Sequence, residues 1–466
     1  MIDKHMFRAY DVRGDVETQL TEESTREIGK ALGVTHFEAD ATVCVGRDAR
    51  ESSPRLSAQL IDGMLSQGIN VVDIGQVTTP MLYFALEKYG VDGGIMVTGS
   101  HNPIGENGLK MCKGKRSFLR EDIASLYEAI VTGRTKADGA RRGILETRDI
   151  SASYAEEILR RVRCPRKLRL VLDAGNGVAG PMAARILSHY ASECVELYCE
   201  PDGRFPNHHP DPSVAANMRD CARKVVETGA DLGLAFDGDG DRLGVVDRSG
   251  EIMASDRLLV LLARDVLRQA PGAAILGDVK CSKFTFDAIS KAGGAAEMSK
   301  TGHAFIKAKM RDSQAALAGE VSGHFFFAEN WYGFDDAIYA AARVCRIVSE
   351  SDKGIGELLS DLPKSYATPE LRIECADEAK FSITDRILNY YSRRYPTSDL
   401  DGARIDFPSG WALVRASNTQ PVLVVRVEAD SHESAQSLCD DLVVQIERFA
   451  AECGASVDLT CLKHLD

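Results

Sequence analysis

Short apolar runs alternate with amphipathic stretches through most of this chain, and no other feature constrains its fold as strongly. Runs such as Thr42–Gly46, Leu168–Asp173 and Ala274–Gly277 have the length and composition of buried strands. Between such runs lie stretches such as residues 55–67, whose apolar residues recur at helical spacing. This alternation predicts α/β domains.

At 466 residues the chain is too long for one hydrophobic core, so three or four domains are expected. Polar or turn-forming stretches at residues 140–143, 248–250 and 362–364 are candidate boundaries. The C-terminal part has a different pattern, with strands near residues 412–428 and a helix from about residue 432 to 451. We expect it to form a domain of another kind.

The segment TGSHNP (residues 98–103) presents a serine on a tight loop. It follows the apolar run Gly94–Val97, a predicted buried strand, and is closed by Asn-Pro. The spacing is not the Gly-x-Ser-x-Gly elbow of hydrolases, because threonine and asparagine replace the two glycines. His101 and Asn102 can donate hydrogen bonds to whatever the hydroxyl carries, so we expect Ser100 to carry a phosphoryl group.

A second segment, FDGDGDR (residues 236–242), follows another predicted strand and places Asp237, Asp239 and Asp241 at alternating positions. Glycines between the carboxylates let one loop wrap a hard cation with oxygen ligands. Three carboxylates this close repel one another unless a cation offsets their charge. Magnesium keeps coordination positions for phosphate oxygens, so the loop suits phosphoryl transfer.

Two other interpretations start from the same acidic loop. A calcium-binding helix–loop–helix needs glycine at the sixth and glutamate at the twelfth loop position, where this chain has Arg242 and Arg248. A strand that ends in Asp-x-Asp also resembles phosphatases with an aspartate nucleophile, which here would be Asp237. That second alternative stays open at this point.

Two further loops are rich in hydrogen-bonding groups. In GEVSGH (residues 319–324), alternate side chains of an extended segment would face the same way, so the glutamate, serine and histidine could converge on vicinal sugar hydroxyls. In RASNTQP (residues 415–421), a guanidinium, two hydroxyls and an amide form a candidate phosphate clamp.

In this order, these segments resemble the α-D-phosphohexomutase family, and within it the bacterial phosphomannomutase/phosphoglucomutase branch. The similarity runs essentially end to end, through FRAYDVRG (7–14), GRD (46–48), TGSHNP, NGLK (107–110), PDGRFP (201–206), DGDGDR, DVK (278–280), KTGH (300–303), GEVSGH and RASNTQP. The stretch 325–339, which contains WYGFDD, also resembles that branch.

The resemblance implies three similar mixed-sheet α/β domains and a distinct C-terminal α+β domain around a central cleft. The expected domains are residues 1–148 with the phosphoserine loop, 149–251 with the metal loop, 252–364 with the sugar-binding loop, and 365–466 with the phosphate clamp.

The resemblance also implies roles for single residues. Ser100 is expected to be phosphorylated and, with Asp237, Asp239 and Asp241, to hold Mg²⁺. Residues expected on the phosphoserine side are Arg13, His101, Lys110 and Arg242. Glu320 and Ser322 are expected to bind the sugar 3- and 4-hydroxyls, and the distal phosphate is expected to lie against His324, Arg415, Ser417, Asn418 and Thr419. Tyr10, Lys280 and His303 match further substrate-side positions, and Lys280 and His303 are candidates for general acid and base.

The implied enzyme is an isomerase, an intramolecular phosphotransferase that interconverts hexose 6-phosphate and hexose 1-phosphate through phospho-Ser100 and a hexose 1,6-bisphosphate. Val321 after Glu320 favours a phosphomannomutase, because phosphoglucosamine mutases, the first alternative, tend to have glutamine there. An aspartyl-phosphate sugar phosphatase is the second alternative, and it leaves three of the four loops without a role. A sugar-phosphate-binding module without chemistry is the third.

One motif points elsewhere. Gly175–Gly180 fits the G-x-G-x-x-G pattern of dinucleotide sites, with Glu200 near where a ribose-binding acid would lie. A strand-to-helix turn also needs glycine for its backbone angles and close packing. We favour the packing interpretation, since the resembled family carries a similar segment with no nucleotide role.

Charge and cysteine content limit the partners and the compartment that we expect for this chain. The net charge of −13 argues against nucleic acid or anionic membranes as partners. The resemblance implies small-molecule sugar phosphates as partners, and we expect a monomer. No apolar stretch approaches the ~18 residues of a membrane span, and residues 1–6 lack the apolar core of a secretory signal. Twelve cysteines without CxxC pairs predict reduced thiols in a cytoplasmic protein and no zinc site.

Overall fold

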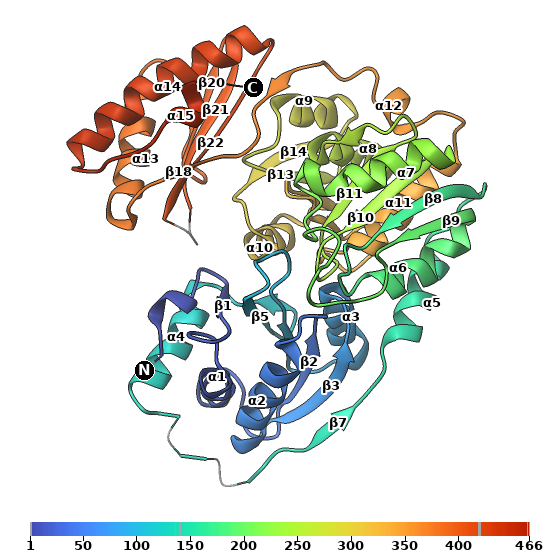
Figure 1. Cartoon of the computed structure of the whole chain (residues 1–466), viewed down its shortest axis with the longest axis vertical. Helices are drawn as coiled ribbons and strands as arrows, with labels where there is room; N and C mark the ends of the chain where they lie inside the picture. The colour runs from blue at the N-terminus through green and yellow to red at the C-terminus, as the bar shows by residue number, and fades with distance from the viewer. Residues whose placement is uncertain (1, 136, 139–140, 418–420, 464, 466) are drawn as a thin grey trace.

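The structure, a computed structural model, describes residues 2–135, 137–138, 141–417, 421–463 and 465. Within this part of the chain the strands form four sheets, which follow one another from blue to red in Figure 1. Each sheet belongs to one domain. None of the described helices combines the length and the apolar character that a membrane-crossing helix needs.

The first domain contains a mixed sheet in the order β1-β5-β4-β2-β3-β7, with β6 paired to β5. Its strands are β1 (Asp11–Asp15), β2 (Thr42–Arg47), β3 (Asn70–Gln76), β4 (Gly93–Val97), β5 (Glu106–Lys113), β6 (Arg116–Ser117) and β7 (Leu145–Thr147). Its helices are η1 (Lys4–Met6), α1 (Glu22–Thr35), α2 (Ser53–Ser66), α3 (Thr79–Tyr89) and α4 (Arg120–Val131).

The second domain has the sheet order β12-β11-β10-β8-β9. Its strands are β8 (Leu168–Asp173), β9 (Ala191–Leu197), β10 (Leu232–Phe236), β11 (Leu243–Asp247) and β12 (Ile252–Met253). Its helices are α5 (Ser151–Arg161), α6 (Gly180–Leu187), η2 (Ser188–Tyr190), η3 (Ala215–Met218) and α7 (Arg219–Thr228).

The third domain has the sheet order β14-β13-β15-β16. Its strands are β13 (Ala274–Asp278), β14 (Ala295–Ser299), β15 (Leu317–Gly319) and β16 (Phe325–Phe327). Its helices are α8 (Ser255–Gln269), α9 (Lys283–Lys291), α10 (His303–Ser313), α11 (Ala337–Ser349) and α12 (Ile355–Leu358).

One four-strand pattern recurs in these three sheets: β5-β4-β2-β3, β11-β10-β8-β9 and β16-β15-β13-β14. In each, the second strand named runs parallel to the third and is followed by an antiparallel return strand. The connecting loops after β4, β10 and β15 carry the predicted serine, the three aspartates and the predicted sugar-binding residues. The predicted similarity of the three domains is therefore confirmed.

The fourth domain is built differently, as predicted. Its sheet, in the order β17-β22-β21-β20-β19 with β18 beside β22, is antiparallel throughout. The strands are β17 (Tyr366–Ala367), β18 (Leu371–Glu374), β19 (Thr397–Ser398), β20 (Ala403–Phe407), β21 (Gly410–Ala416) and β22 (Val422–Ala429). The helices α13 (Asp377–Tyr391), α14 (His432–Glu452) and α15 (Thr460–Lys463) lie together beside the sheet (Figure 1).

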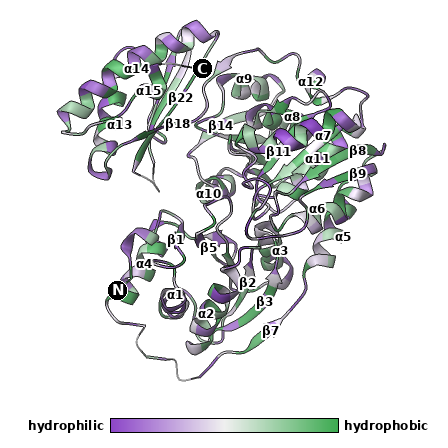
Figure 2. Ribbon diagram, in the orientation of Figure 1, coloured by the Kyte–Doolittle hydropathy of each residue, from purple (hydrophilic) through white to green (hydrophobic). Residues whose placement is uncertain are grey.

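The hydrophobic core follows the same division. One cluster of buried residues runs through the first three domains, whereas the fourth domain has a cluster of its own. Figure 2 shows green, apolar faces of helices turned toward the sheets. The helix α11 ties the second and third domains together, because all its residues except Arg346 are buried and its alanines let neighbouring strands approach closely.

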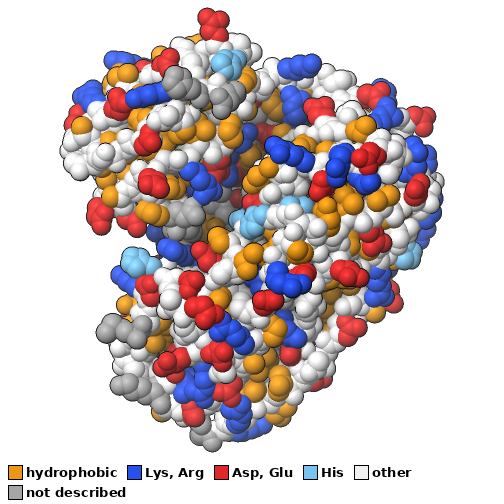
Figure 3. All heavy atoms as spheres, in the orientation of Figure 1, with side chains coloured by type: hydrophobic (Ala, Val, Ile, Leu, Met, Phe, Trp, Pro, Cys, Tyr) orange, Lys and Arg blue, Asp and Glu red, His pale blue; other side chains and the backbone are white. Residues whose placement is uncertain are grey.

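Polar contacts and a small hydrophobic cluster of Val279, Trp411 and Leu413 join the fourth domain to the third. Arg404 donates to the backbone carbonyls of Val279 and Cys281, and the Ser282 hydroxyl donates to Glu428. Figure 3 shows a hollow between the fourth domain and the first, bordered by Lys, Arg and His side chains. This is the central cleft that the fold prediction requires.

Candidate active site

Two buried residues of the first domain shape the serine loop. Asp48 accepts hydrogen bonds from the Thr98 hydroxyl and the Gly99 N–H at 2.8 and 3.0 Å. The Arg50 guanidinium donates to backbone carbonyls of the loop, including that of Ser100 at 2.8 Å. Ser100 itself has φ of +46°, a left-handed conformation that is strained for a residue with a side chain. The loop thus holds the hydroxyl in one direction.

The aspartate loop of the second domain lies directly against this serine loop. A Cβ atom on Gly238 would lie 2.3 Å from the Ser100 carbonyl oxygen, so only glycine permits this approach. The side chains of Asp237, Asp239 and Asp241 are completely buried. Asp237 Oδ1 accepts hydrogen bonds from the backbone N–H groups of Asp241 and Arg242, both at 3.0 Å, which fixes the loop.

Hydrogen bonds between the two domains join serine to aspartates. Ser100 Oγ donates to Asp237 Oδ2 at 2.6 Å. Lys110 Nζ donates to Asp239 Oδ2 at 2.7 Å and to Asp241 Oδ2 at 2.5 Å. The structure therefore brings together the serine of the TGSHNP loop, the three aspartates of the metal loop and Lys110 of the NGLK segment.

The carboxylates of this group repel one another. Burial and the neighbouring carboxylates of Asp241 and Asp239 raise the pKa of Asp237 well above its ordinary value. Burial also opposes ionisation of Asp239, but the Lys110 ammonium lowers the pKa of that carboxyl overall. A bound cation would offset the repulsion and favour the ionised form of Asp237.

The oxygen donors fit a metal ion. Ligand atoms of Asp237, Asp239 and Asp241 lie within 4.8 Å of one another. Oδ1 of Asp239 and Oδ1 of Asp241 are buried and have no hydrogen-bond partner among the described residues. An all-oxygen set of carboxylates is what a hard divalent cation prefers.

Two further predicted residues border the serine. His101 Nδ1 lies 3.0 Å from Ser100 Oγ. Burial and then the charges of Arg242 and Arg13 lower the pKa of His101 well below its ordinary value, so this ring is neutral. Arg13 donates to Asp11 at 2.6 Å and to the Asn102 side chain at 2.8 Å, which places its guanidinium at the edge of the serine loop.

The GEVSGH loop of the third domain is a turn, not the extended segment that we predicted. Gly323 has φ of +97°, and its N–H donates to the Glu320 carbonyl at 3.0 Å. The premise of alternating side chains on one face was therefore wrong. Glu320 accepts the Gly302 N–H at 2.6 Å, and Ser322 is partly exposed on the turn.

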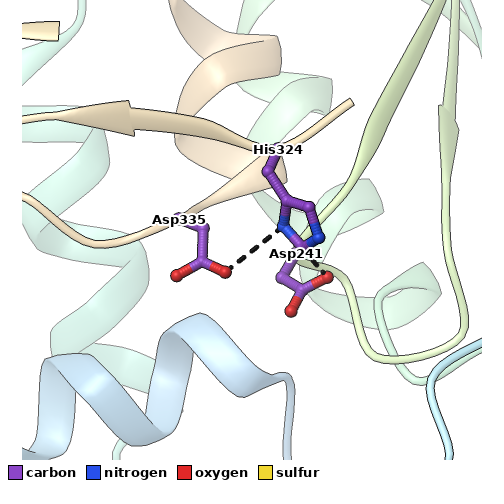
Figure 4. A group of neighbouring side chains, drawn as sticks. All are labelled: Asp241, His324 and Asp335. Carbon is purple, nitrogen blue, oxygen red and sulfur yellow. Dashed lines mark ion pairs between the residues drawn. The ribbon is translucent and has the colours of Figure 1, made fainter. Parts of the chain in front are cut away.

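His324 lies beside the metal loop. A backbone bridge pairs it with Arg242, and Arg242 Nε donates to His324 Nε2 at 3.1 Å. On its other side, His324 Nδ1 lies 3.3 Å from Asp335 Oδ2 and 3.6 Å from Asp241 Oδ1 (Figure 4). These contacts differ from those of Arg415, with which the sequence grouped His324.

His303 begins α10 and faces the first domain. Its ring packs edge-on against Tyr10, with ring centroids 5.0 Å apart. Both ring nitrogens are buried without a hydrogen-bond partner among the described residues, and Nδ1 lies 3.9 Å from Asp335 Oδ2. Burial and the charge of Lys307 lower the pKa of His303 well below its ordinary value.

The remaining predicted residues lie where the third and fourth domains meet. Lys280 Nζ pairs with Glu370 at 3.0 Å, and Arg415 Nε pairs with Asp401 at 2.8 Å. Asp401 also accepts the Thr301 N–H at 3.1 Å. Ser417 is buried at the end of β21, and Asn418 and Thr419 lie outside the described residues.

Tyr10 connects this region to the first domain. Burial is the main cause that raises its pKa to about 12, and the charges of Glu320 and Arg415 both act on it as well. The contact between the Tyr10 and His303 rings joins the first domain to the third.

Comparisons with known proteins agree with this geometry. Four family models match in order: phosphoglucomutase/phosphomannomutase, alpha/beta/alpha domain I over residues 4–137, domain II over 152–250, domain III over 254–366, and the C-terminal domain over 370–445. The chain belongs to the phosphoglucomutase/phosphomannomutase family. This confirms the predicted resemblance to the α-D-phosphohexomutases and with it the predicted class of enzyme, an isomerase. The exact domain boundaries stay predictions.

Individual relatives cover nearly the whole chain. It is 45% identical over 451 residues to a phosphomannomutase/phosphoglucomutase of Pseudomonas putida, with 96% of each chain covered. It is 42% identical over 460 residues to a phosphoglucomutase of Neisseria gonorrhoeae, with 96% and 97% covered. A crystal structure of a phosphoglucomutase/phosphomannomutase family protein from Burkholderia thailandensis superposes with a TM-score of 0.90 at 40% identity, covering 98% of this chain and all of the other.

In this phosphohexomutase the glycine-rich segment 175–180 serves packing. A Cβ atom on Gly177 would lie 2.9 Å from the Gly238 Cα, and one on Gly180 would lie 2.0 Å from the Cys199 carbonyl oxygen. The first contact places the glycine-rich segment directly against the metal loop, so the packing interpretation of the motif is confirmed.

Several functional residues of this phosphohexomutase were missed from the sequence. They are the carboxylates and cations that hold predicted site residues in place: Asp48, Arg50, Lys307, Asp335, Glu370 and Asp401. Asp48 and Asp335 were within reach, because they lie in the GRD and WYGFDD segments that supported the resemblance. The others are single polar residues in ordinary contexts, and only their partners in space mark them.

Proposed function

We propose that this chain interconverts hexose 6-phosphates and hexose 1-phosphates, with mannose or glucose as the sugar, through a phosphorylated Ser100 and a hexose 1,6-bisphosphate. The observation that carries the proposal is the hydrogen bond from Ser100 to Asp237, beside the bridge from Lys110 to Asp239 and Asp241. A serine in this setting can hold a phosphoryl group between a lysine and a metal site.

The first transfer needs positive charge around the phosphoryl group and an aligned acceptor. The bond between phosphorus and Ser100 Oγ breaks, and a bond to a sugar hydroxyl oxygen forms. Lys110 lies on one side of the serine loop, and Arg242 and Arg13 lie near the edge of that loop. Their cations neutralise the charge that moves from one oxygen to the other.

Asp237, Asp239 and Asp241 would hold Mg²⁺, which supplies further charge neutralisation at the phosphoryl oxygens when it is bound. The loop already holds the three carboxylates close together, so the binding of Mg²⁺ requires little rearrangement of the backbone.

The sugar hydroxyl must lose its proton as it attacks. We assign this proton to His303 rather than Lys280. The His303 ring is neutral because burial lowers its pKa, so it can accept a proton. Burial alone would favour neutral Lys280, but the Glu370 carboxylate raises the pKa of Lys280 overall, so the ammonium stays charged.

The second transfer returns a phosphoryl group to Ser100 from the other end of the bisphosphate. The sugar must turn around between the two transfers, so the distal phosphate needs a binding site that accepts either end. Arg415 and Ser417 on the fourth domain, with Lys280 on the third, supply that site. Glu320 and Ser322 on the turn between them bind the hydroxyls common to both orientations.

The alternatives fit less well. Relatives named for mannose or glucose phosphate cover the whole chain, whereas a phosphoglucosamine mutase is favoured by no residue described above. An aspartyl-phosphate enzyme would need a free Asp237, but both oxygens of Asp237 accept hydrogen bonds in the interior of the site.

A coupled mutase assay tests the proposal. Mannose 1-phosphate, glucose 1-phosphate and glucosamine 1-phosphate are compared with Mg²⁺ and a trace of hexose 1,6-bisphosphate. Turnover of mannose or glucose phosphate, with acid-stable phosphate on Ser100, is the expected result. Turnover of glucosamine phosphate alone would favour the first alternative, and a hydroxylamine-labile phosphate would favour the second.

A further inference from the structure

Asp335 is a completely buried carboxylate that none of the proposed roles uses. It lies in the loop between β16 and α11, behind the two histidines of the cleft. Its Oδ1 accepts a hydrogen bond from Lys307 Nζ at 3.0 Å. Its Oδ2 lies 3.3 Å from His324 Nδ1, and neither of these two buried atoms has a hydrogen-bond partner among the described residues (Figure 4). Lys307 is fixed in turn, because its ammonium lies 3.9 Å from the centre of the Tyr83 ring.

A metal ion is one occupant to consider for this group. The ligand atoms of Asp241, His324 and Asp335 all lie within 4.8 Å of one another. However, Arg242 Nε donates a hydrogen bond to His324 Nε2, and a guanidinium has no lone pair with which to accept one. The lone pair of the neutral ring is therefore on Nε2 and the proton on Nδ1. A protonated Nδ1 cannot be a metal ligand, so these residues form a chain of polar contacts instead.

We propose that Asp335, held by Lys307, is a positioning residue for phosphoryl transfer that keeps His324 in its Nδ1–H tautomer and through His324 orients the Arg242 guanidinium. The assignment builds on the proposed transfer at Ser100. The chain of contacts runs from Lys307 to Asp335, His324 and Arg242, and it links the third domain to the residue that follows the metal loop.

The backbone supports the same link. Besides the bridge between Arg242 and His324, the Leu243 N–H donates to the Gly323 carbonyl at 3.0 Å. The two side chains thus start from adjacent positions. The ion pair of the Arg242 guanidinium with Asp211 is longer, at 3.9 Å, so the shorter contact with His324 sets the direction of Nε.

Electrostatics keep Asp335 ionised, so that its carboxylate can accept hydrogen bonds. Burial alone would favour its neutral form, but the Lys307 ammonium holds the pKa of Asp335 well below its ordinary value. Replacement by asparagine has a defined consequence. Lys307 needs an acceptor, so the amide oxygen would face Lys307 and the NH₂ group would face His324. The ring would then carry its proton on Nε2, against the Arg242 N–H.

The tautomer is the first test and needs no activity. The protein is labelled with ¹⁵N at its ten histidines, and two-bond ¹⁵N–¹H correlation spectra are recorded, with His324→Gln to assign the signal. We expect the Nδ1–H form in the natural protein and the Nε2–H form in Asp335→Asn. An Nε2–H ring in the natural protein would overturn the proposal whether or not the enzyme is a mutase.

A double-mutant cycle is the second test. Asp335→Asn is expected to lower kcat by roughly 10- to 100-fold with little change in KM. An Arg242 guanidinium that points in the wrong direction destabilises the transition state more than it weakens substrate binding. In an Arg242→Gln background the same change should cost less than about threefold, because its effect acts through Arg242. Equal losses in both backgrounds would refute the link.

Two further variants guard against a fold defect. Asp265→Asn is the matched control, since Asp265 is also a buried carboxylate of the third domain and pairs with Arg343 at 2.7 Å. It should lower stability and leave kcat within about twofold. If Asp335→Asn does not fold, Lys307→Gln replaces it in the cycle, with the same two outcomes.

Discussion

In one half of the cleft, charged groups of the site pair with one another, and in the other half they pair with supporting residues. The transfer half consists of Ser100, Lys110, Asp237, Asp239 and Asp241, where serine and lysine from the first domain bond to aspartates of the second. The clamp half consists of Lys280, Arg415 and Ser417, where the two cations pair with Glu370 and Asp401 instead.

The difference also follows the cores. The transfer half lies between the first and second domains, which share one hydrophobic cluster, whereas the clamp half lies where the fourth domain, with its own cluster, meets the third. Bond-making needs fixed distances, and binding a phosphate in two orientations needs a surface that admits both. We therefore expect changes in the transfer half to reduce turnover and changes in the clamp half to reduce binding.

The largest effect is expected from Ser100→Ala, which removes the phosphoryl carrier. Turnover in the coupled assay should fall by at least about 10³-fold, because the hydroxyl that bonds to Asp237 and carries the phosphoryl group is lost. Ser66→Ala is the control, since Ser66 is also buried but lies on α2, outside the site, and donates to the Gly63 carbonyl. Near-normal turnover of Ser100→Ala would contradict the proposed mechanism.

Asp239→Asn is expected to act next most strongly. Loss of one of three carboxylates should weaken Mg²⁺ binding at least about tenfold and lower kcat by roughly 10²-fold. Binding is measured by titration calorimetry, and turnover at saturating Mg²⁺. Asp247→Asn is the control, because Asp247 is a buried carboxylate of the same domain that accepts the Ile355 N–H outside the site. Unchanged Mg²⁺ affinity would remove Asp239 from the metal site.

Arg415→Ala tests the clamp half. KM for glucose 1-phosphate should rise roughly 10- to 100-fold, while kcat stays within about threefold, because the lost contact is equally strong in the ground and transition states. Arg394→Ala, an exposed arginine of the same domain that lies over the Tyr390 ring, should change neither constant. A large fall in kcat with unchanged KM would show that the two halves are not separable.

The smallest effect concerns the link between the third and fourth domains. Burial opposes ionisation of Glu370, but the Lys280 ammonium lowers the pKa of Glu370 overall, from 4.5 to about 2. A carboxyl with a lowered pKa stabilises the folded protein above its unfolded pKa and loses this contribution as the pH falls from about 4.5 toward 2. Glu370→Gln should therefore cost about 1–2 kcal/mol at pH 7, after allowance for partial exposure, and less at pH 3.5.

Urea unfolding of both proteins at the two pH values measures the difference. Lys224–Glu227 provides the control, since this exposed ion pair on α7 should contribute almost nothing at either pH when Glu227 is replaced by Gln. An equal loss for Glu370→Gln at both pH values would show that the ion pair with Lys280 is not its source.

The strands and helices were largely predictable because their signals are local. The predicted strand at residues 168–173 matches β8, and the helix predicted from about residue 432 to 451 matches α14 (His432–Glu452). Apolar spacing alone marks such elements, since each must bury one face. The recurrence of one four-strand pattern was not visible, because strand order depends on which strands pair and not on their composition.

The site was predictable to a different depth in its two halves. The transfer half could be predicted from two short loops, because their residue types are compatible with few functions other than phosphoryl transfer and metal binding. The GEVSGH loop shows where such inference ended: its residues are in the cleft, but an assumed extended conformation gave the wrong mutual orientation, and a left-handed Gly323 decides the turn. The supporting carboxylates Asp401 and Glu370 carry no local signal at all.

The sequence by itself determined the chemistry that this protein can offer: a serine on a tight loop, three carboxylates around glycines, and polar loops that suit sugars and phosphates. These follow from side-chain chemistry and short spacings, which a chain carries into any fold. Only the tertiary structure decided which groups meet. It brought the Ser100 hydroxyl to Asp237, gave Lys110 two aspartates from another domain and set Asp335 behind His324, because these contacts join residues that are remote in sequence and become neighbours only when the domains pack.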